Sequence, residues 1–312
     1  MSHSDRTAYL MLAAMAVCFG GTWVPAAVAV ESVPPFTIAA VRFGLASLLL
    51  YGWARVAKRP ISPISGARDL VMIAGLAITA VAGYNWLFLT GLTLAPAADG
   101  AIIVPGLAPV FTAVIAALVI GERLGPRGYV GLALAGAGLL LVVRPAGGAD
   151  ADRLIGDGLF VAGAALWGVY SVLARTASRR FNAVSTTLYG TSLGTLILVP
   201  LAVIEGGGGA LLAAPAEAQA GIAYLAVFGT VAAFVLLNLG VARIGAARAS
   251  AFALLVPIVG VLSSVAILGD ELGPTTIAGG LVVFIGLWLV EHRGGNGTSP
   301  QATQPRATAT EA

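Results

Sequence analysis

The sequence contains little of what a water-soluble protein needs on its surface. Charged residues make up 10% of the 312 positions and hydrophobic residues 58%, whereas about 25% charged residues is usual in soluble domains. With so few polar side chains, a fold of this size could not cover its exterior in water. The mean hydropathy of +0.95 excludes an intrinsically disordered chain. The apolar residues form runs of about 20 instead of alternating, which excludes an outer-membrane barrel and predicts a polytopic helical membrane protein.

Residues for covalent, metal and phosphate chemistry are scarce as well. Cys18 is the only cysteine, so an intrachain disulfide is excluded. The two histidines, His3 and His292, lie in the terminal segments, and a histidine-based metal site is not expected. The chain lacks the G-x-x-x-x-G-K-[ST] motif, which excludes ATP hydrolysis by this chain. Because the basic residues lie in loops beside the apolar runs, we expect no nucleic-acid partner. We also expect no cofactor.

Ten apolar runs are separated by short segments that carry charge, Gly or Pro. They cover residues 8–30, 35–56, 69–91, 97–120, 127–143, 156–174, 183–204, 219–241, 246–268 and 274–290. The first run is too long for the apolar part of a typical signal peptide, so we interpret it as a retained span. Residues 294–312, rich in Gly, Thr, Ala, Pro and Gln, are predicted to form a disordered cytoplasmic tail.

The chain contains an internal repeat at an offset of 148 positions. This shift aligns Gly121–Pro126 with Gly269–Pro274, and Pro109 with Pro257, without a gap. Further matches are Gly131 with Gly279, Gly138 with Gly286, and Phe19-Gly20 with Trp167-Gly168. We therefore predict an all-α integral membrane protein with a five-helix repeat over 1–148 and a second over 149–293. Because each half has an odd number of spans, the second repeat is expected to be inverted.

Loop charges predict the orientation, because cytoplasmic loops collect Lys and Arg. With the N-terminus inside, most of the 17 Lys and Arg fall in segments on that side, including Lys58 and Arg243. Equivalent loops also differ in charge, since Glu122-Arg123 corresponds to Asp270-Glu271. We expect a multi-pass protein of a bacterial-type inner membrane with both termini in the cytoplasm.

These motifs resemble the drug/metabolite transporter superfamily, specifically its ten-helix EamA-type branch. The resemblance covers about residues 8–290 and rests on Phe19-Gly20, Arg42, Tyr84-Asn85-Trp86, and the stretches 107–124 and 255–272. Gly190 stands at the position in the second half that matches Arg42, so a role of this arginine is not duplicated. The resemblance implies an exporter of amino acids or other small metabolites, with a central cavity lined by spans one, three, four, six, eight and nine.

Inverted repeats are typical of secondary transporters, which bind substrate near the midplane where the repeats meet. We therefore expect a transporter and not an enzyme, moving an amino acid or related metabolite outward by alternating access. Drug, cation or metabolite uptake and a non-transporting membrane scaffold are the alternatives. The expected partners are the bilayer and a small-molecule substrate, and the chain is expected to be a monomer or a homodimer. An intramembrane enzyme would need clustered acids, bases or nucleophiles, which the sequence does not offer.

Five side chains are candidates for binding the substrate: Trp23, Tyr84, Asn85, Trp167 and Tyr170. Tyr84 and Asn85 lie deep in the third apolar run, where an interfacial aromatic belt does not explain them. The amide of Asn85 could hold the amine or carboxylate of a zwitterion. Trp167 and Tyr170 share one helical face, and Trp23 pairs similarly with Phe19. Ordinary packing between helices is the alternative for all five.

Two prolines and two charged residues are candidates for hinges or gates. Pro109 and Pro257 are predicted near the middle of spans four and nine, where each would free a carbonyl, of Pro105 and of Ala253. Packed kinks are the alternative.

Apart from residues at helix ends, Arg42 and Asp99 are the charges predicted within or near spans. Both would lie toward the outer face and could form a gating pair or anchor the structure. No other acid is expected at depth, so proton coupling would require Asp99. The small residues Gly131, Ala135 and Gly138 predict a close helix contact or a dimer face.

Overall fold

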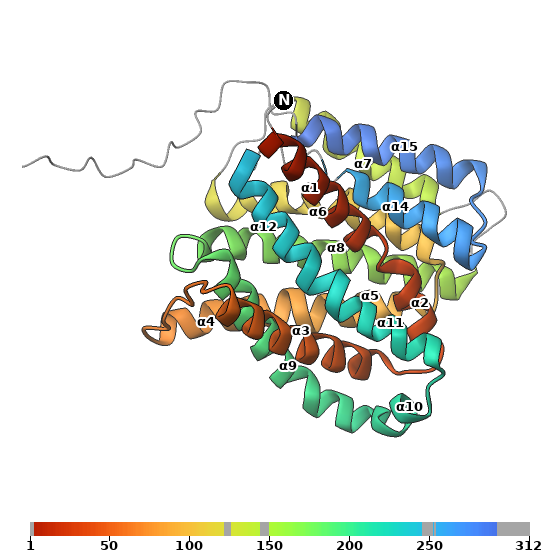
Figure 1. The fold of residues 1–312 in the computed structure, drawn as a ribbon. Coiled ribbons are helices and arrows are strands. Elements are labelled where there is room, and N and C mark those ends of the chain that lie inside the picture. The colour runs from red at the N-terminus through yellow and green to blue at the C-terminus, as the bar shows by residue number, and fades with distance from the viewer. Residues whose placement is uncertain (1–2, 122–125, 144–149, 245–251, 253, 292–312) are drawn as a thin grey trace, which may run out of the picture.

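The computed structural model describes residues 3–121, 126–143, 150–244, 252 and 254–291, and all regular elements in these ranges are helical (Figure 1). The first half contains α1 (His3–Gly20), α2 (Trp23–Val30), α3 (Pro35–Val56), α4 (Ala67–Leu76), the π-helical η1 (Ala77–Gly83), α5 (Tyr84–Leu92), α6 (Ala97–Ile120) and α7 (Pro126–Val143). The second half contains α8 (Ala151–Ala177), α9 (Ala183–Glu205), α10 (Gly207–Ala213), α11 (Ala216–Ala226), the π-helical η2 (Val227–Ala232), α12 (Ala233–Ile244), α14 (Leu255–Ser263), the π-helical η3 (Ser264–Leu268) and α15 (Pro274–Glu291). The predicted tail 294–312 and the Glu122-Arg123 pair lie outside the described residues.

Seven helical segments are long and apolar enough to cross a membrane. They are Arg6–Val30, Pro35–Val56, Ala67–Leu92, Ala97–Val119, Ala151–Ala177, Ala183–Glu205 and Ala216–Ile244. Three shorter apolar helices, at Pro126–Val142, Leu255–Leu268 and Pro274–Leu289, correspond to the remaining predicted runs. The described part of the chain is therefore all-helical, with multiple helices that could cross a membrane, while ten crossings stay a prediction. The short α10 was not predicted, because its Gly-rich sequence was interpreted as a loop.

Proline and glycine set the helix ends. Pro35 is the first residue of α3, where the missing N–H of proline would have had no helical partner. Gly121 ends α6 and Gly269 ends η3, and both have a φ of 76°. This left-handed conformation is one that glycine adopts without a steric penalty from a Cβ atom.

Two apolar segments are interrupted by a π-helical turn near their middle. In the segment Ala67–Leu92 the Asn85 amide donates a hydrogen bond of 2.8 Å to the carbonyl of Ala80, five residues earlier. In the segment Ala216–Ile244 the Thr230 hydroxyl donates a hydrogen bond of 2.9 Å to the carbonyl of Leu225, again five residues earlier. Such turns displace the helix register locally and are frequent at functional sites.

The helices pack in pairs that join the two halves (Figure 1). α7 lies along α15, α6 along α8, α3 along α9, and α1 along α12 and α14. The largest hydrophobic cluster, which includes Trp23, Phe88 and Phe160, draws residues from both halves. Neither half therefore has a separate core among the described residues.

The stripe of small residues on α7, Gly131, Ala135 and Gly138, packs against another helix of the same chain. A methyl group on Gly138 would come within 2.6 Å of the Gly279 carbonyl oxygen, and one on Gly286 within 2.6 Å of the Gly131 carbonyl oxygen. Ala135 is fully buried, and Gly286 lies against its backbone. The dimer-face alternative for this stripe is therefore wrong, because α15 of the same chain covers it.

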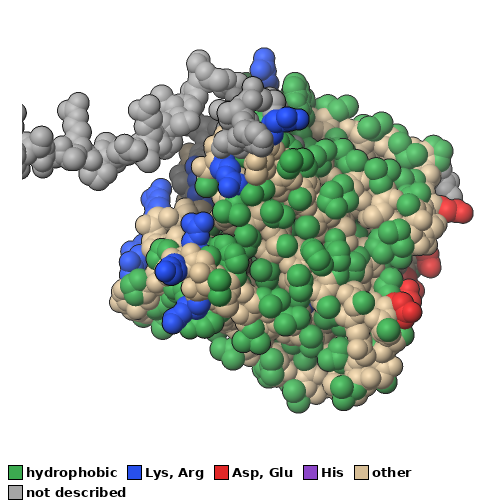
Figure 2. Space-filling view, viewed as in Figure 1, with side chains coloured by type: hydrophobic (Ala, Val, Ile, Leu, Met, Phe, Trp, Pro, Cys, Tyr) green, Lys and Arg blue, Asp and Glu red, His purple; other side chains and the backbone are tan. Residues whose placement is uncertain are grey.

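Surface charge is divided between the two ends of the bundle. On the face shown in Figure 2, Lys and Arg gather at one end and Asp and Glu at the other, with a broad hydrophobic band between them. Lys58 follows α3 and Arg243 lies in the last turn of α12. Glu31 follows α2 and Asp270 precedes α15. We call the end of the bundle with Lys58 and Arg243 the basic end, and the end with Glu31 and Asp270 the acidic end.

A substitution pair on α7 tests the close contact with α15. Gly138→Ala should destabilise the protein by about 1–3 kcal/mol, because the added methyl group meets backbone atoms of α15 that cannot move aside. Gly136→Ala is the matched control, since a methyl group there has no neighbour within 4 Å. The measurement is the midpoint of thermal unfolding in detergent. Equal midpoints for the two variants would contradict the packing described.

Candidate transport cavity

A cavity of about 530 Å³ lies between the two halves. Its wall is built from α2, α3, α5, α6 and α8, with Phe19 of α1 and Val256 of α14. The resemblance implied walls from spans one, three, four, six, eight and nine. Instead, α3 contributes Arg42, and no lining residue among those described comes from the segment Ala216–Ile244.

Aromatic rings form one side of this cavity. Tyr84 contacts Trp167 with ring centroids 5.0 Å apart and Phe88 with centroids 5.9 Å apart. Trp23 meets Phe88 edge-on at 4.9 Å. The predicted residues Trp23, Tyr84 and Trp167 therefore all line the cavity. The predicted Tyr170 does not, because it lies behind Trp167 at a centroid distance of 5.1 Å and packs against a separate cluster around Phe181.

Arg42 is buried and extends from α3 to the cavity wall. Its Nη1 donates a hydrogen bond of 3.1 Å to Oδ1 of Asn85, and its Nε donates one of 3.2 Å to the hydroxyl of Thr230. Asn85 is 2% exposed and does not line the cavity, so it holds Arg42 and is not placed to contact a solute directly. The suggested pair between Arg42 and Asp99 is wrong, because Asp99 has a different partner.

The acidic end of the cavity is sealed. Arg153 of α8 binds Asp99 of α6 through two hydrogen bonds of 2.8 and 3.0 Å. The carboxylate of Asp270 accepts a hydrogen bond of 2.9 Å from the backbone N–H of Ala98. Beneath these polar contacts, the Trp23 and Phe160 rings meet edge-on with centroids 5.9 Å apart. We call Asp99, Arg153, Asp270, Trp23 and Phe160 the acidic-end seal. Sequence reasoning missed Arg153 because it stands among acids in a separator.

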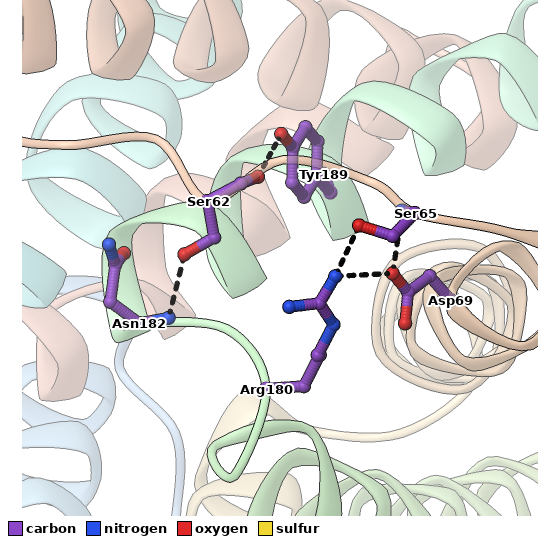
Figure 3. A network of polar contacts seen from close by, with 6 residues as sticks. All are labelled: Ser62, Ser65, Asp69, Arg180, Asn182 and Tyr189. Carbon is purple, nitrogen blue, oxygen red and sulfur yellow. Dashed lines mark hydrogen bonds and ion pairs between the residues drawn. The ribbon is translucent and has the colours of Figure 1, made fainter.

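The cavity extends toward the basic end. Thr112 and Ala116 on α6, and Ser171 and Arg175 on α8, line it there. At the same end, a polar network joins the loop before α4 to the turn between α8 and α9 (Figure 3).

In this network Nη2 of Arg180 donates a hydrogen bond to the hydroxyl of Ser65 and lies 3.4 Å from the carboxylate of Asp69. The Tyr189 hydroxyl donates a hydrogen bond of 2.6 Å to the carbonyl of Ser62, whose hydroxyl accepts one from the Asn182 N–H. None of these residues lines the cavity, so the network fixes the loops at this end without contributing to the cavity wall.

The two predicted hinge prolines occupy different positions in their helices. Pro109 lies inside α6 together with Pro105, and both line the cavity. Without an N–H on Pro109, the carbonyl of Pro105 lacks its helical partner. Pro257 is the third residue of α14 and is buried away from the cavity, so it is not a mid-helix proline in the described structure. The carbonyl of Ala253 lies outside the described residues.

Asp157 is a buried acid at the boundary of the predicted run 156–174, and the sequence interpretation did not count it as an acid at depth. It lies inside α8 and is fully buried, and neither carboxylate oxygen has a hydrogen-bond partner in the described part of the chain. The charged groups that interact with it are Asp99 from α6 and Arg153, one turn earlier on α8. The neighbouring α5 carries no charged residue. The expectation that Asp99 is the only acid at depth is therefore wrong, because α8 begins five residues earlier than the predicted span.

Comparison with known proteins gives one family over nearly the whole chain. The sequence pattern of the EamA-like transporter family matches residues 6–144 and 154–291. A transporter from Bacillus subtilis, YyaM, is 28% identical, with 89% of this chain and 92% of that protein covered. A probable terminal-alkyne amino-acid exporter from Streptantibioticus cattleyicolor is 31% identical, over 73% of this chain and 75% of that protein.

Two further matches concern substrate and fold. The aromatic amino acid exporter YddG from Ancylobacter novellus is 31% identical, over 64% of this chain and 68% of that protein. A solved crystal structure covers 96% of this chain and 99% of its own, with a TM-score of 0.63 and 22% identity. At that identity the structural match shows the fold alone.

The buried acid on α8 gives a stability prediction. Asp157→Asn should raise the thermal unfolding midpoint in detergent, because burying a carboxylate without hydrogen-bond partners costs more than burying an amide. Asp152→Asn is the control, because Asp152 is exposed on the same helix. Equal shifts of the midpoint for both variants would refute the assignment.

Proposed function

Because the chain belongs to the EamA-like transporter family, we propose that it is a secondary transporter that moves an amino acid or related metabolite out of the cell by alternating access. Members of this family are transporters and not enzymes. The observation that carries the proposal is the cavity itself, which extends toward the basic end and is sealed at the acidic end. A carrier in a conformation that is open to one side of the membrane would have a cavity of this form.

We further propose that ten helices cross the membrane as two inverted repeats, residues 1–148 and 149–293. Helix pairing supports this. α1 packs against α12 and α14, while α8, at the equivalent place in the second half, packs against α5 and α6. α3 packs against α9, and α7 against α15, so each of these helices meets its own counterpart 148 positions later. An inverted two-fold arrangement produces this exchange of partners.

Local backbone features support the same repeat. Gly121 and Gly269 are 148 positions apart, share a φ of 76°, and each end a helix in the left-handed conformation. Shifting η1 (Ala77–Gly83) by the same offset makes it overlap η2 (Val227–Ala232). Equivalent bends in opposite halves would let the two ends of the cavity exchange shapes at little cost in free energy.

The orientation follows from charge. Because Lys and Arg favour the cytoplasmic side, we place the basic end and both termini in the cytoplasm of a bacterial-type inner membrane. The cavity is then open to the inside, ready to load a solute for export. Opening outward would require breaking the acidic-end seal, including the 2.7 Å ion pair between Asp99 and Arg153, and closing α6 against α8 at the basic end.

The aromatic wall supports an amino acid with an apolar side chain as substrate. Two relatives are named as amino-acid exporters, one of them for aromatic amino acids. Trp23, Tyr84 and Trp167 offer ring faces to a solute of that kind, and aromatic contacts of this type contribute about 0.5–1.5 kcal/mol each.

Flux measurements in proteoliposomes test this function. A panel of amino acids should include at least one that exchanges across the membrane, and Trp167→Ala should reduce that flux roughly three- to tenfold through loss of the cavity wall. Trp86→Ala is the matched control, because Trp86 is 42% exposed, stacks on Phe36 and does not line the cavity. No flux for any solute of the panel, or equal losses in both variants, would contradict the proposal.

A further inference from the structure

We infer that Arg42 is the anchor for a carboxylate group of the transported solute, so the substrate class is small organic acids and amino acids that carry a free carboxylate next to an apolar body. This inference rests on the proposed transport function and adds to it the group that recognises the substrate.

The guanidinium of Arg42 has no anionic partner among the described residues. The ion pairs found there are Asp99 with Arg153 and Asp69 with Arg180. Arg42 donates instead to two neutral oxygens, on Asn85 and Thr230. A buried cation that lacks an anion is unfavourable, and a carboxylate in the cavity would supply the missing charge.

The geometry leaves donors available for such an anion. A guanidinium has five N–H groups in one plane, and the two hydrogen bonds found use Nε and Nη1. No acceptor in the described part of the chain takes the N–H groups of Nη2. Arginine binds carboxylates well through paired parallel hydrogen bonds, so these free donors suit a carboxylate better than a single hydroxyl.

The charge of the cavity wall points to the same ligand class. Arg42 and Arg175 are the charged residues that line the cavity, and no lining residue in the described structure is an acid. Like charges repel strongly where water is scarce. A purely cationic solute is therefore disfavoured, and an anionic or zwitterionic one is attracted.

The position of Arg42 explains how a bound carboxylate could influence the conformational change. Asn85 donates to the carbonyl of Ala80 in η1, and Thr230 of η2 donates to the carbonyl of Leu225 in α11, two residues before η2 begins. Arg42 therefore joins the two π-helical turns, one from each half. An anion that draws the guanidinium toward the cavity would change its hydrogen bonds to both halves. Asn85 and Thr230 are thus positioning residues, not ligands.

The rings beside Arg42 define the rest of the solute. Tyr84 and Trp167 line the same cavity, in contact with each other. A ligand whose carboxylate binds Arg42 would place its apolar body against these rings. Phenylalanine and its analogues are suitable probes, since the carboxylate can be removed while the ring is kept.

Binding of three probes to the detergent-solubilised full chain tests the inference. The probes are L-phenylalanine, 3-phenylpropionate and L-phenylalaninamide, with affinity measured by isothermal titration calorimetry. We expect the two carboxylates to bind and the amide to bind at least about tenfold more weakly, because it lacks the charge-assisted hydrogen bonds.

Variants then assign the effect to Arg42. Arg42→Gln should weaken binding of both carboxylates at least about tenfold and should not weaken binding of the amide, whose ammonium group is repelled by Arg42. Arg42→Lys keeps the charge and should retain part of the binding, which controls for a folding defect. Thr230→Ala removes one hydrogen bond of Arg42 without changing its charge, and its loss should be smaller than that of Arg42→Gln.

The outcomes separate this inference from the proposed function. Equal binding of acid and amide, or carboxylate binding unchanged in Arg42→Gln, would overturn the role of Arg42, while flux in proteoliposomes would still support transport. Binding of none of the three probes to the folded wild-type chain would overturn the inference together with the proposed amino-acid substrate.

Discussion

The buried positive charge of Arg42 is the constraint on which the rest of the site depends. A guanidinium inside a membrane-embedded bundle requires polar groups around it, and the chain provides them by interrupting two helical segments. η1 and η2 shift the register so that Asn85 and Thr230 face the same arginine from opposite halves. The charge, the two π-helical turns and the cavity therefore form one unit at the place where the halves meet.

The contacts at the acidic end of the cavity differ from those at the basic end. The acidic end holds three contacts: the ion pair of Asp99 with Arg153, the hydrogen bond from Ala98 at the start of α6 to Asp270, and the edge-on contact of Trp23 with Phe160. At the basic end, the polar network around Arg180 binds loops together outside the cavity. Asp157 interacts with Asp99 and Arg153 of the acidic-end seal, and its carboxylate has no hydrogen-bond partner among the described residues. The proposed alternating access would require these contacts to open.

Helix positions were predictable from the sequence because runs of apolar residues, glycine and proline decide them locally. Side-chain partners were not, because tertiary packing decides them. The arginine at position 42 stood out as an intramembrane charge, yet its proposed partner Asp99 lies at the acidic end, where Arg153 from another helix binds it. Asn85 was noticed as polar at depth, but only the π-helical turn directs it toward Arg42 and away from the cavity. Asp157 was missed because it stands at the boundary of the predicted run, and the sequence did not show that α8 begins at Ala151. The family could be recognised because its motifs span the chain, and it is shown by the match over both halves.

The most direct test of alternating access is chemical access to the cavity from each side of the membrane. Ala113 lines the cavity and is 5% exposed, so Ala113→Cys in a Cys18→Ser background places a single thiol inside it. Rates of labelling by a membrane-impermeant maleimide would be measured in vesicles of each orientation. We predict fast labelling from the face that carries the basic end and slower labelling from the acidic face, accelerated there by Asp99→Asn. Labelling from one face only, unchanged when the seal is weakened, would contradict alternating access.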